Sequence, residues 1–144
     1  MRALTLRDRL RRGEVYLIRF SLPDNPSVVI NKYALNLQEG MIVDSSPTFV
    51  CVNLTLERLD RMYPWDVYVS PDECGVPSGA KVIGSQIHTI DKGNIIRHAY
   101  TLSEATMAAV DQAIMLGTGL AKYEDLPKAV DEPTSEPGEA AGTS

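Results

Sequence analysis

The feature that most constrains the fold is a series of short β-rich runs, separated by turn-forming residues and followed by one amphipathic segment. Strands are predicted where valine, isoleucine, tyrosine and phenylalanine gather, over 13–22, 28–38, 48–55, 65–70, 80–87 and 94–99. Proline, glycine and asparagine favour chain reversals over 23–27, near Glu39 and Gly40, and over 71–79. Many short strands joined by turns favour a small antiparallel β-barrel.

One segment has a convincing helical pattern. Ser103 is suited to cap the free N–H groups at a helix start, and Glu104 suits the positive end of the helix dipole. Met107, Val110 and Ile114 then recur at three- and four-residue spacing, which places them on one face. The fold class predicted is therefore mainly β, a β-barrel with a C-terminal helix.

Charge divides the 144 residues unevenly. Five arginines crowd residues 1–12, which we expect to form a basic N-terminal arm or a short helix. Residues 13–120 are predicted to form one barrel domain. Residues 121–144 are rich in acids and proline and are predicted to be a disordered acidic tail. The net charge of −5 comes mostly from this tail. The rest of the chain is nearly neutral and has a basic N-terminal segment, so it can bind a polyanion.

Composition excludes several classes of protein. The chain contains no apolar run long enough to span a membrane, and no apolar segment follows the N-terminal charges, so we expect a cytoplasmic protein. Cys51 and Cys74 are far apart and have no neighbouring histidine cluster, so two reduced thiols are expected. We predict no metal site and no cofactor.

Five stretches occur in an order that resembles the PemK/MazF family of toxins. They read RGEVYLIRF at 12–20, NKYALNLQ at 31–38, VNLT at 52–55, GSQIHTIDKGNI at 84–95 and LSEATMAAVDQAIMLGTGL at 102–120. No single stretch is decisive, but their order and spacing are fairly specific. The resemblance implies an SH3-like barrel that acts as a homodimer. It also implies cleavage of single-stranded RNA without a metal, and a cognate antitoxin that blocks the RNA groove.

The resemblance also implies two residues at the scissile phosphate. The family's arginine position falls on Lys32 and its threonine position on Thr55. Lysine keeps the positive charge but lacks the planar fork with which arginine holds a phosphate. Such cleavage uses the ribose 2′-OH as nucleophile, so the protein must move protons and stabilise a crowded phosphorane.

The chain departs from the family pattern at two places. Residues 23–33, PDNPSVVINKY, replace the family's glycine-rich loop before the second strand. Ser85 stands where the family has an aspartate, whereas Gln86 is retained as an RNA contact or a strand residue. His88 falls on the same strand face as Gln86, and its ordinary pKa suits acid–base catalysis as well as a packing role.

Further candidates lie outside these motifs. Arg58 and Arg61, in the connector after Thr55, and Arg19 are predicted to contact RNA, together with Ser85 and Gln86. Three aromatic residues either stack on bases or fill the core: Tyr63, Trp65 and Tyr68.

Three functions remain open from the sequence. The first is a metal-independent endoribonuclease with Lys32, Thr55 and His88 as catalytic residues, acting as the toxin of a toxin–antitoxin system. The second is a nucleic-acid-binding or regulatory barrel weakened in catalysis. The third is a toxin directed at a protein, like the gyrase-poisoning CcdB toxins of the same architecture. The acidic tail adds the hypothesis that it covers the RNA-binding surface in cis.

Overall fold

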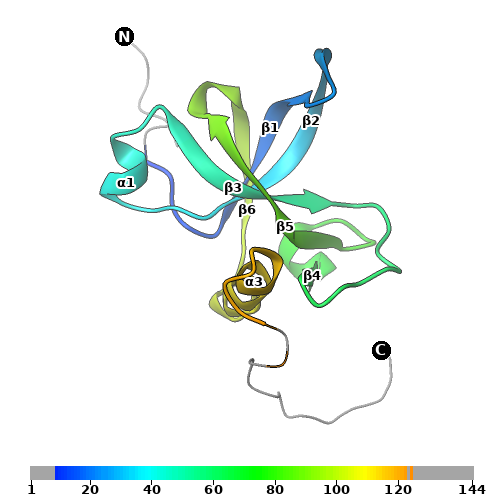
Figure 1. Cartoon of the computed structure of the whole chain (residues 1–144). Coiled ribbons are helices and arrows are strands. Elements are labelled where there is room, and N and C mark those ends of the chain that lie inside the picture. The colour runs from blue at the N-terminus through cyan, green and yellow to red at the C-terminus, as the bar shows by residue number, and fades with distance from the viewer. Residues whose placement is uncertain (1–8, 123, 125–144) are drawn as a thin grey trace.

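The computed structural model describes residues 9–122 and 124. Its main feature is a six-stranded antiparallel sheet in the order β4-β5-β3-β2-β1-β6 (Figure 1). The strands are β1 Glu14–Leu22, β2 Asn25–Asn36, β3 Thr48–Thr55, β4 Asp66–Val69, β5 Ala80–Asp91 and β6 Ile95–Thr101. The helices are α1 Met41–Asp44, α2 Pro71–Cys74, the 3₁₀ turn η1 Lys92–Asn94, and α3 Glu104–Gly117.

The predicted fold class is confirmed. Ser103 caps α3 by accepting a hydrogen bond from the N–H of Thr106 at 3.2 Å, as its sequence position predicts. The sheet is barrel-like rather than closed, because β4 and β6 are its two edges. In Figure 1 the β1–β2 hairpin points away from α3.

Strand β2 begins earlier than predicted, and β5 ends later. The reversal expected over 23–27 is shorter, since Leu22 already pairs with Asn25, and β2 therefore begins at Asn25. Strand β5 continues past Ile87 to Asp91, because Thr48 to Cys51 of β3 pair with its second half. The helix α1, which follows Gly40, was not predicted; it is a single turn whose Val43 is fully buried.

The predicted basic arm and acidic tail fall mostly on residues 1–8, 123 and 125–144, outside the described residues. Residues 9–12 are described and form no helix. Leu10 is buried, and the Arg12 guanidinium donates to Asp111 of α3 and to the Leu37 carbonyl. This part of the arm therefore packs against the barrel, whereas the domain limits at 13 and 120 stay predictions.

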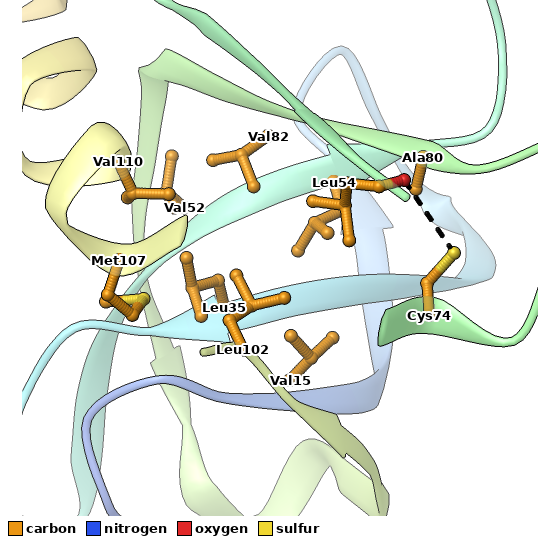
Figure 2. Packing of buried hydrophobic residues seen from close by; sticks show 11 residues of the cluster. Val15, Leu35, Val52, Leu54, Cys74, Ala80, Val82, Leu102, Met107 and Val110 are labelled. Carbon is orange, nitrogen blue, oxygen red and sulfur yellow. Dashed lines mark hydrogen bonds between the residues drawn. The ribbon is translucent and has the colours of Figure 1, made fainter. Parts of the chain in front are cut away.

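The two faces of the sheet carry separate apolar clusters. One face packs under α3 and α2, where Val15, Leu35 and Val52 meet Met107 and Val110 (Figure 2). On the other face Tyr16, Ile18, Phe49 and Cys51 lie beneath Leu10 and α1. Cys51 and Cys74 are both free thiols and belong to different clusters. Each fully buried aliphatic side chain contributes about 1.5–3 kcal/mol, so the two clusters fix the strands that carry the site.

Candidate functional site

A cleft of about 580 Å³ opens on the sheet face opposite α3. It lies where the second apolar cluster ends along β3. Side chains from β2, β3, β5 and the β3–β4 connector line it: Lys32, Asn53, Leu54, Thr55, Glu57, Arg58, Arg61, Tyr63, Lys81, Ile83 and Gln86. Segments far apart in the sequence thus contribute to one hollow.

Strand alternation brings the β2 and β3 residues into the cleft. Side chains two residues apart share a face, so Asn53 and Thr55 follow Cys51 on the same side of β3. Tyr33 pairs with Leu54, and Lys32 and Thr55 are therefore neighbours across the two strands. The antiparallel register therefore places side by side the two residues that were predicted to contact the scissile phosphate.

A register shift in β5 brings Gln86 to the same cleft. Val52 pairs with Ile87 but Leu54 pairs with Val82, so β5 has extra residues between these two pairs. Gly84 lies in this bulge against the backbone of α3. A Cβ atom on Gly84 would be 2.7 Å from the Ala113 carbonyl oxygen, and one on Gly117 would be 2.6 Å from the Gly84 oxygen. Contact between the two glycines therefore holds the bulge against the helix.

Lys81 organises the connector between β3 and β4. Lys81 is 5% exposed, and its Nζ lies 3.5 Å from Asp66 Oδ2. The same Nζ donates to the carbonyl oxygens of Arg58 and Arg61. Arg58 has a φ of 56°, a left-handed conformation that is strained for a residue with a Cβ. The buried lysine thus stabilises a strained loop that places two arginines at the cleft.

The cleft is strongly cationic. Four cationic side chains line it, against the single carboxylate of Glu57. The Lys81 ammonium is already engaged by carbonyls and Asp66, which leaves Lys32, Arg58 and Arg61 to attract an anion. Lys32 Nζ lies 4.8 Å from the centre of the Phe20 ring, a cation–π contact that holds it at the cleft edge. This arrangement suits a polyanionic ligand.

Lys32 also acts on two neighbouring titratable groups. Burial raises the pKa of the Cys51 thiol to about 12, although the charge of Lys32 opposes the rise. Burial lowers the pKa of His88 below its ordinary value of 6.5, and the charge of Lys32 lowers it further. The His88 ring lies 5.1 Å from the Phe20 ring in an edge-to-face contact. His88 is therefore uncharged near neutral pH.

Asn53 connects His88 with Gln86. Its Nδ2 lies 3.1 Å from Gln86 Oε1 and 3.0 Å from His88 Nε2. Asn53 is 3% exposed, and its Oδ1 is buried without a hydrogen-bond partner among the described residues. Thr55 makes a local bond, because its Oγ1 accepts from the backbone N–H of Glu57 at 3.1 Å. These hydrogen bonds fix the positions of the polar side chains of β3 and β5 at the cleft.

Among residues 9–122 and 124, no group of three histidine, cysteine, aspartate or glutamate side chains is arranged to hold a metal ion. Nor does that part of the chain contain a helix long and apolar enough to cross a membrane.

Comparison with known families decides what kind of barrel this is. The model of the PemK-like, MazF-like toxins of type II toxin–antitoxin systems matches residues 11–117. The chain belongs to that family. The match includes every strand, α3 and all the cleft residues, so the cleft is part of the family domain.

Solved structures agree on the fold. An endoribonuclease from a mycobacterial species, in complex with its cognate antitoxin, is 25% identical with a TM-score of 0.61; the match covers 76% of this chain and 95% of that one. A second mycobacterial endoribonuclease is 22% identical with a TM-score of 0.61, covering 83% and 94%. MazF from Deinococcus radiodurans is 14% identical with a TM-score of 0.64, covering 77% and 97%. A comparison with curated proteins finds no match.

Most of the predicted site residues meet in the cleft. Lys32, Thr55, Arg58, Arg61 and Gln86 all line it. They come from three separate stretches of the sequence, which only the pairing of β2, β3 and β5 brings together.

The remaining predicted residues lie elsewhere. Ser85 lines a smaller hollow of about 170 Å³ next to the cleft. His88 lies behind Asn53 and does not line the cleft. Arg19 is exposed and follows Ile18, which pairs with Lys32, so alternation directs it to the opposite face of the sheet.

The aromatic candidates divide into two groups. Tyr63 and Trp65 stack on each other, with ring centres 5.1 Å apart and an interplanar angle of 2°. Both line the smaller hollow, and Tyr63 also lines the cleft. Tyr68 lines neither hollow, and its hydroxyl donates to the Ser78 carbonyl at 3.1 Å.

Three polar cleft residues were missed by sequence reasoning: Asn53, Glu57 and Lys81. Asn53 gave a usable signal, because it is the one amide within the apolar run TFVCVNLT. Lys81 and Glu57 gave none, since isolated charges at strand ends and in connectors are usually solvated.

Proposed function

We propose that this family member is the toxin of a toxin–antitoxin system and a metal-independent endoribonuclease that cleaves single-stranded RNA. One observation carries the proposal: the cleft joins Lys32 and Thr55 from adjacent strands, with Arg58 and Arg61 on the connector beside them. A cationic cleft with a hydroxyl next to a lysine suits an RNA phosphate. The mycobacterial endoribonucleases that share the fold add support.

Lys32 and Thr55 would act on the scissile phosphate. Attack by the ribose 2′-OH on the adjacent phosphorus produces a phosphorane with extra negative charge. The Lys32 ammonium neutralises this charge, and the Thr55 hydroxyl donates to a non-bridging oxygen. Arg58, Arg61 and Gln86 hold the flanking nucleotides, and Ser85 lies where the RNA would extend into the smaller hollow.

Proton transfer requires a base for the 2′-OH and an acid for the leaving 5′-oxygen. Glu57 is the carboxylate that lines the cleft, close behind Thr55 in the chain, and we assign it the role of base. Lys32 is the cationic donor closest to Thr55 along the paired strands and can protonate the leaving oxygen. His88 acts through its hydrogen bond to Asn53 and is a positioning residue in this scheme.

The proposal includes partners. One solved structure of this fold is a mycobacterial endoribonuclease in complex with its cognate antitoxin, and another is a MazE–MazF complex from Deinococcus radiodurans. By analogy we propose a cognate antitoxin that covers the cleft, a homodimer as the active form, and action in the cytoplasm.

The test is cleavage of a long single-stranded RNA by the purified full-length protein in EDTA. Wild type should cut the RNA, whereas Lys32→Ala and Thr55→Ala should each reduce the rate by about 10²–10³. Arg97→Ala is the matched control, because Arg97 is an exposed cation on β6 that does not line the cleft. This variant should retain the wild-type rate.

Two outcomes would contradict the proposal. Intact RNA after incubation with folded wild type would contradict the nuclease activity. Tight RNA binding in the same sample would then favour a barrel that binds RNA without cutting it. Cleavage that stops in EDTA and returns when a divalent ion is added would contradict metal independence, although the protein would still be a nuclease.

A further inference from the structure

Tyr63 and Trp65, at the end of the connector between β3 and β4, form an offset aromatic stack. Their rings lie at an interplanar angle of 2°, with centres 5.1 Å apart. Tyr63 is nonetheless 45% exposed and lines both the cleft and the smaller hollow. Because Trp65 covers part of one ring face, the exposed surface of the tyrosine lies mostly on the opposite face and the ring edges.

Backbone hydrogen bonds hold both rings in place. The N–H of Tyr63 donates to Asp66 Oδ2 at 3.0 Å, and its carbonyl accepts from the Asp66 N–H at 2.9 Å. Asp66 is in turn paired with the buried Lys81. The Trp65 carbonyl accepts from the N–H of Gly84, in the β5 bulge, at 2.7 Å. A ring that is fixed before a ligand arrives loses little conformational entropy when the ligand covers it.

The position of Tyr63 distinguishes it from other exposed aromatic residues, which are common on protein surfaces. Tyr68 is 48% exposed, but it lines neither hollow and its hydroxyl donates to the Ser78 carbonyl. Tyr63 lines the same cleft as Lys32 and as Arg61, which lies two residues earlier in the connector. The cleft therefore offers a flat, supported ring beside cationic groups.

A ligand that uses both features must combine negative charge with flat rings. A phosphate group alone has no use for an aromatic surface. A single-stranded nucleic acid carries a phosphate on each nucleotide and bases whose faces are free to stack on a protein ring. In a duplex the neighbouring base pairs cover those faces. The pairing of ring and cations thus favours an unpaired strand.

We propose that Tyr63, supported by Trp65, is a binding residue on which one unpaired base of the RNA stacks while Arg61 and Lys32 hold phosphates. This inference rests on the proposed function, because it assumes that the cleft receives RNA. Every base has a face that can stack, so we expect Tyr63 to contribute affinity and not a preference for one base.

The test measures binding of hexamers that cannot be cut, because fluorine replaces the 2′-OH that acts as nucleophile. One is a hexamer of adenosine, and the other is abasic but carries the same phosphates. Tyr63→Ala should weaken binding of the adenosine hexamer about tenfold to a hundredfold and leave the abasic hexamer unchanged. Tyr68→Ala is the matched control: it removes a similarly exposed tyrosine outside both hollows and should change neither affinity.

Two further variants separate stacking from support of the connector. Tyr63→Phe keeps the ring, so it should recover most of the affinity that Tyr63→Ala loses. Arg61→Ala should weaken both hexamers by a similar factor and reduce the salt dependence of binding, since its charge acts on the phosphates. If Tyr63 only shaped the connector, its loss would weaken both hexamers in the same way.

A spectroscopic measurement on wild type does not depend on the folding of any variant. The base 2-aminopurine is fluorescent, and its emission falls when it stacks on another ring. An abasic hexamer that carries a single 2-aminopurine should lose most of its emission when it binds to wild type. The same hexamer bound to Tyr63→Ala should keep most of its emission.

Contradictory results are distinct from failure of the proposed function. Equal binding of the adenosine hexamer by wild type and Tyr63→Ala, or full 2-aminopurine emission at saturation, would overturn the inference while cleavage in EDTA still stands. An equal loss for both hexamers would make Tyr63 a support of the connector. Unchanged RNA binding with weaker self-association, measured by sedimentation, would assign the ring to a protein contact. If neither hexamer bound and RNA stayed intact, the proposed function would fail together with this inference.

Discussion

Two halves of one sheet face differ sharply in this protein, although both are carried by β3. On its first half Phe49 and Cys51 point into an apolar cluster covered by Leu10 and α1. On its second half Asn53 and Thr55 point into the open, cationic cleft. Asn53 is nonetheless 3% exposed, hardly more than Cys51 at 1%. Asn53 is thus almost as buried as its apolar neighbours on the strand, and the difference lies in the interactions that compensate its burial.

The apolar half is stabilised by the removal of hydrocarbon from water, which is not directional. The polar half depends on hydrogen bonds and charge pairs at fixed distances, such as those of Lys81 and Asn53. Loss of one partner there leaves a buried polar group unsatisfied, whereas an apolar cluster repacks in part. The cleft half should therefore be the more sensitive to small chemical changes.

The largest effect is expected from Lys81→Ala. This change leaves the Asp66 carboxylate, whose side chain is 2% exposed, without its cation, and frees the carbonyls of Arg58 and Arg61. We expect a loss of about 3–5 kcal/mol in the free energy of unfolding, measured by urea denaturation. Lys32→Ala is the matched control: it removes a lysine from the same cleft but only a cation–π contact, and should cost below about 1 kcal/mol. Equal losses for the two variants would contradict the structural role of Lys81.

A smaller effect is expected at the contact between the β5 bulge and α3. Gly84→Ala places a methyl group 2.7 Å from backbone atoms of Ala113 and Trp65, so strand and helix must separate. The expected loss is about 1–3 kcal/mol in the free energy of unfolding. Gly93→Ala is the control, since a Cβ there meets nothing within 4 Å, and should change stability by less than about 0.5 kcal/mol. A Gly84→Ala protein as stable as wild type would show that the bulge does not need this contact.

The smallest effect concerns His88, which lies at the boundary between the halves, against Phe20 on one side and Asn53 on the other. Burial and Lys32 lower its folded-state pKa, so the unfolded chain binds the proton more readily. The stability that His88 contributes is therefore full above about pH 6.5 and is lost as pH falls through the folded pKa.

The measurement is the urea midpoint followed from pH 7.5 down to pH 5. His88→Gln should reduce the loss of stability at the acidic end, whereas His98→Gln should leave it in place. An unchanged pH profile in His88→Gln would assign the acid sensitivity to other groups.

Much of the fold could be predicted because its signals are local. Strand alternation and turn residues located all six strands, and β3 was predicted with its observed limits. The cap at Ser103 and the spacing of Met107 and Val110 gave the start and buried face of α3. The short turn at Pro23 and Asp24 was missed because five consecutive residues there favour reversal and only pairing with β1 decides which of them turn.

The candidate site was predicted in part. The family pattern named Lys32, Thr55 and Gln86, the charged connector indicated Arg58 and Arg61, and all five line the cleft. Arg19 and His88 were also predicted as site residues, but alternation and packing direct them elsewhere. Asn53, Glu57 and Lys81 were not predicted, because their place in the cleft depends on which residues the folded chain brings next to them.

The sequence by itself determined which segments become strands, where the helix starts, and which residue types are available for a phosphate. These follow from side-chain shape and periodicity, which act over a few neighbouring residues. Only the tertiary structure decided the bulge of β5, the burial of Lys81 and the orientation of the Asn53 amide. Each of these depends on atoms from segments at least 15 residues apart. A hydrogen bond between such segments exists only after the sheet has set their register.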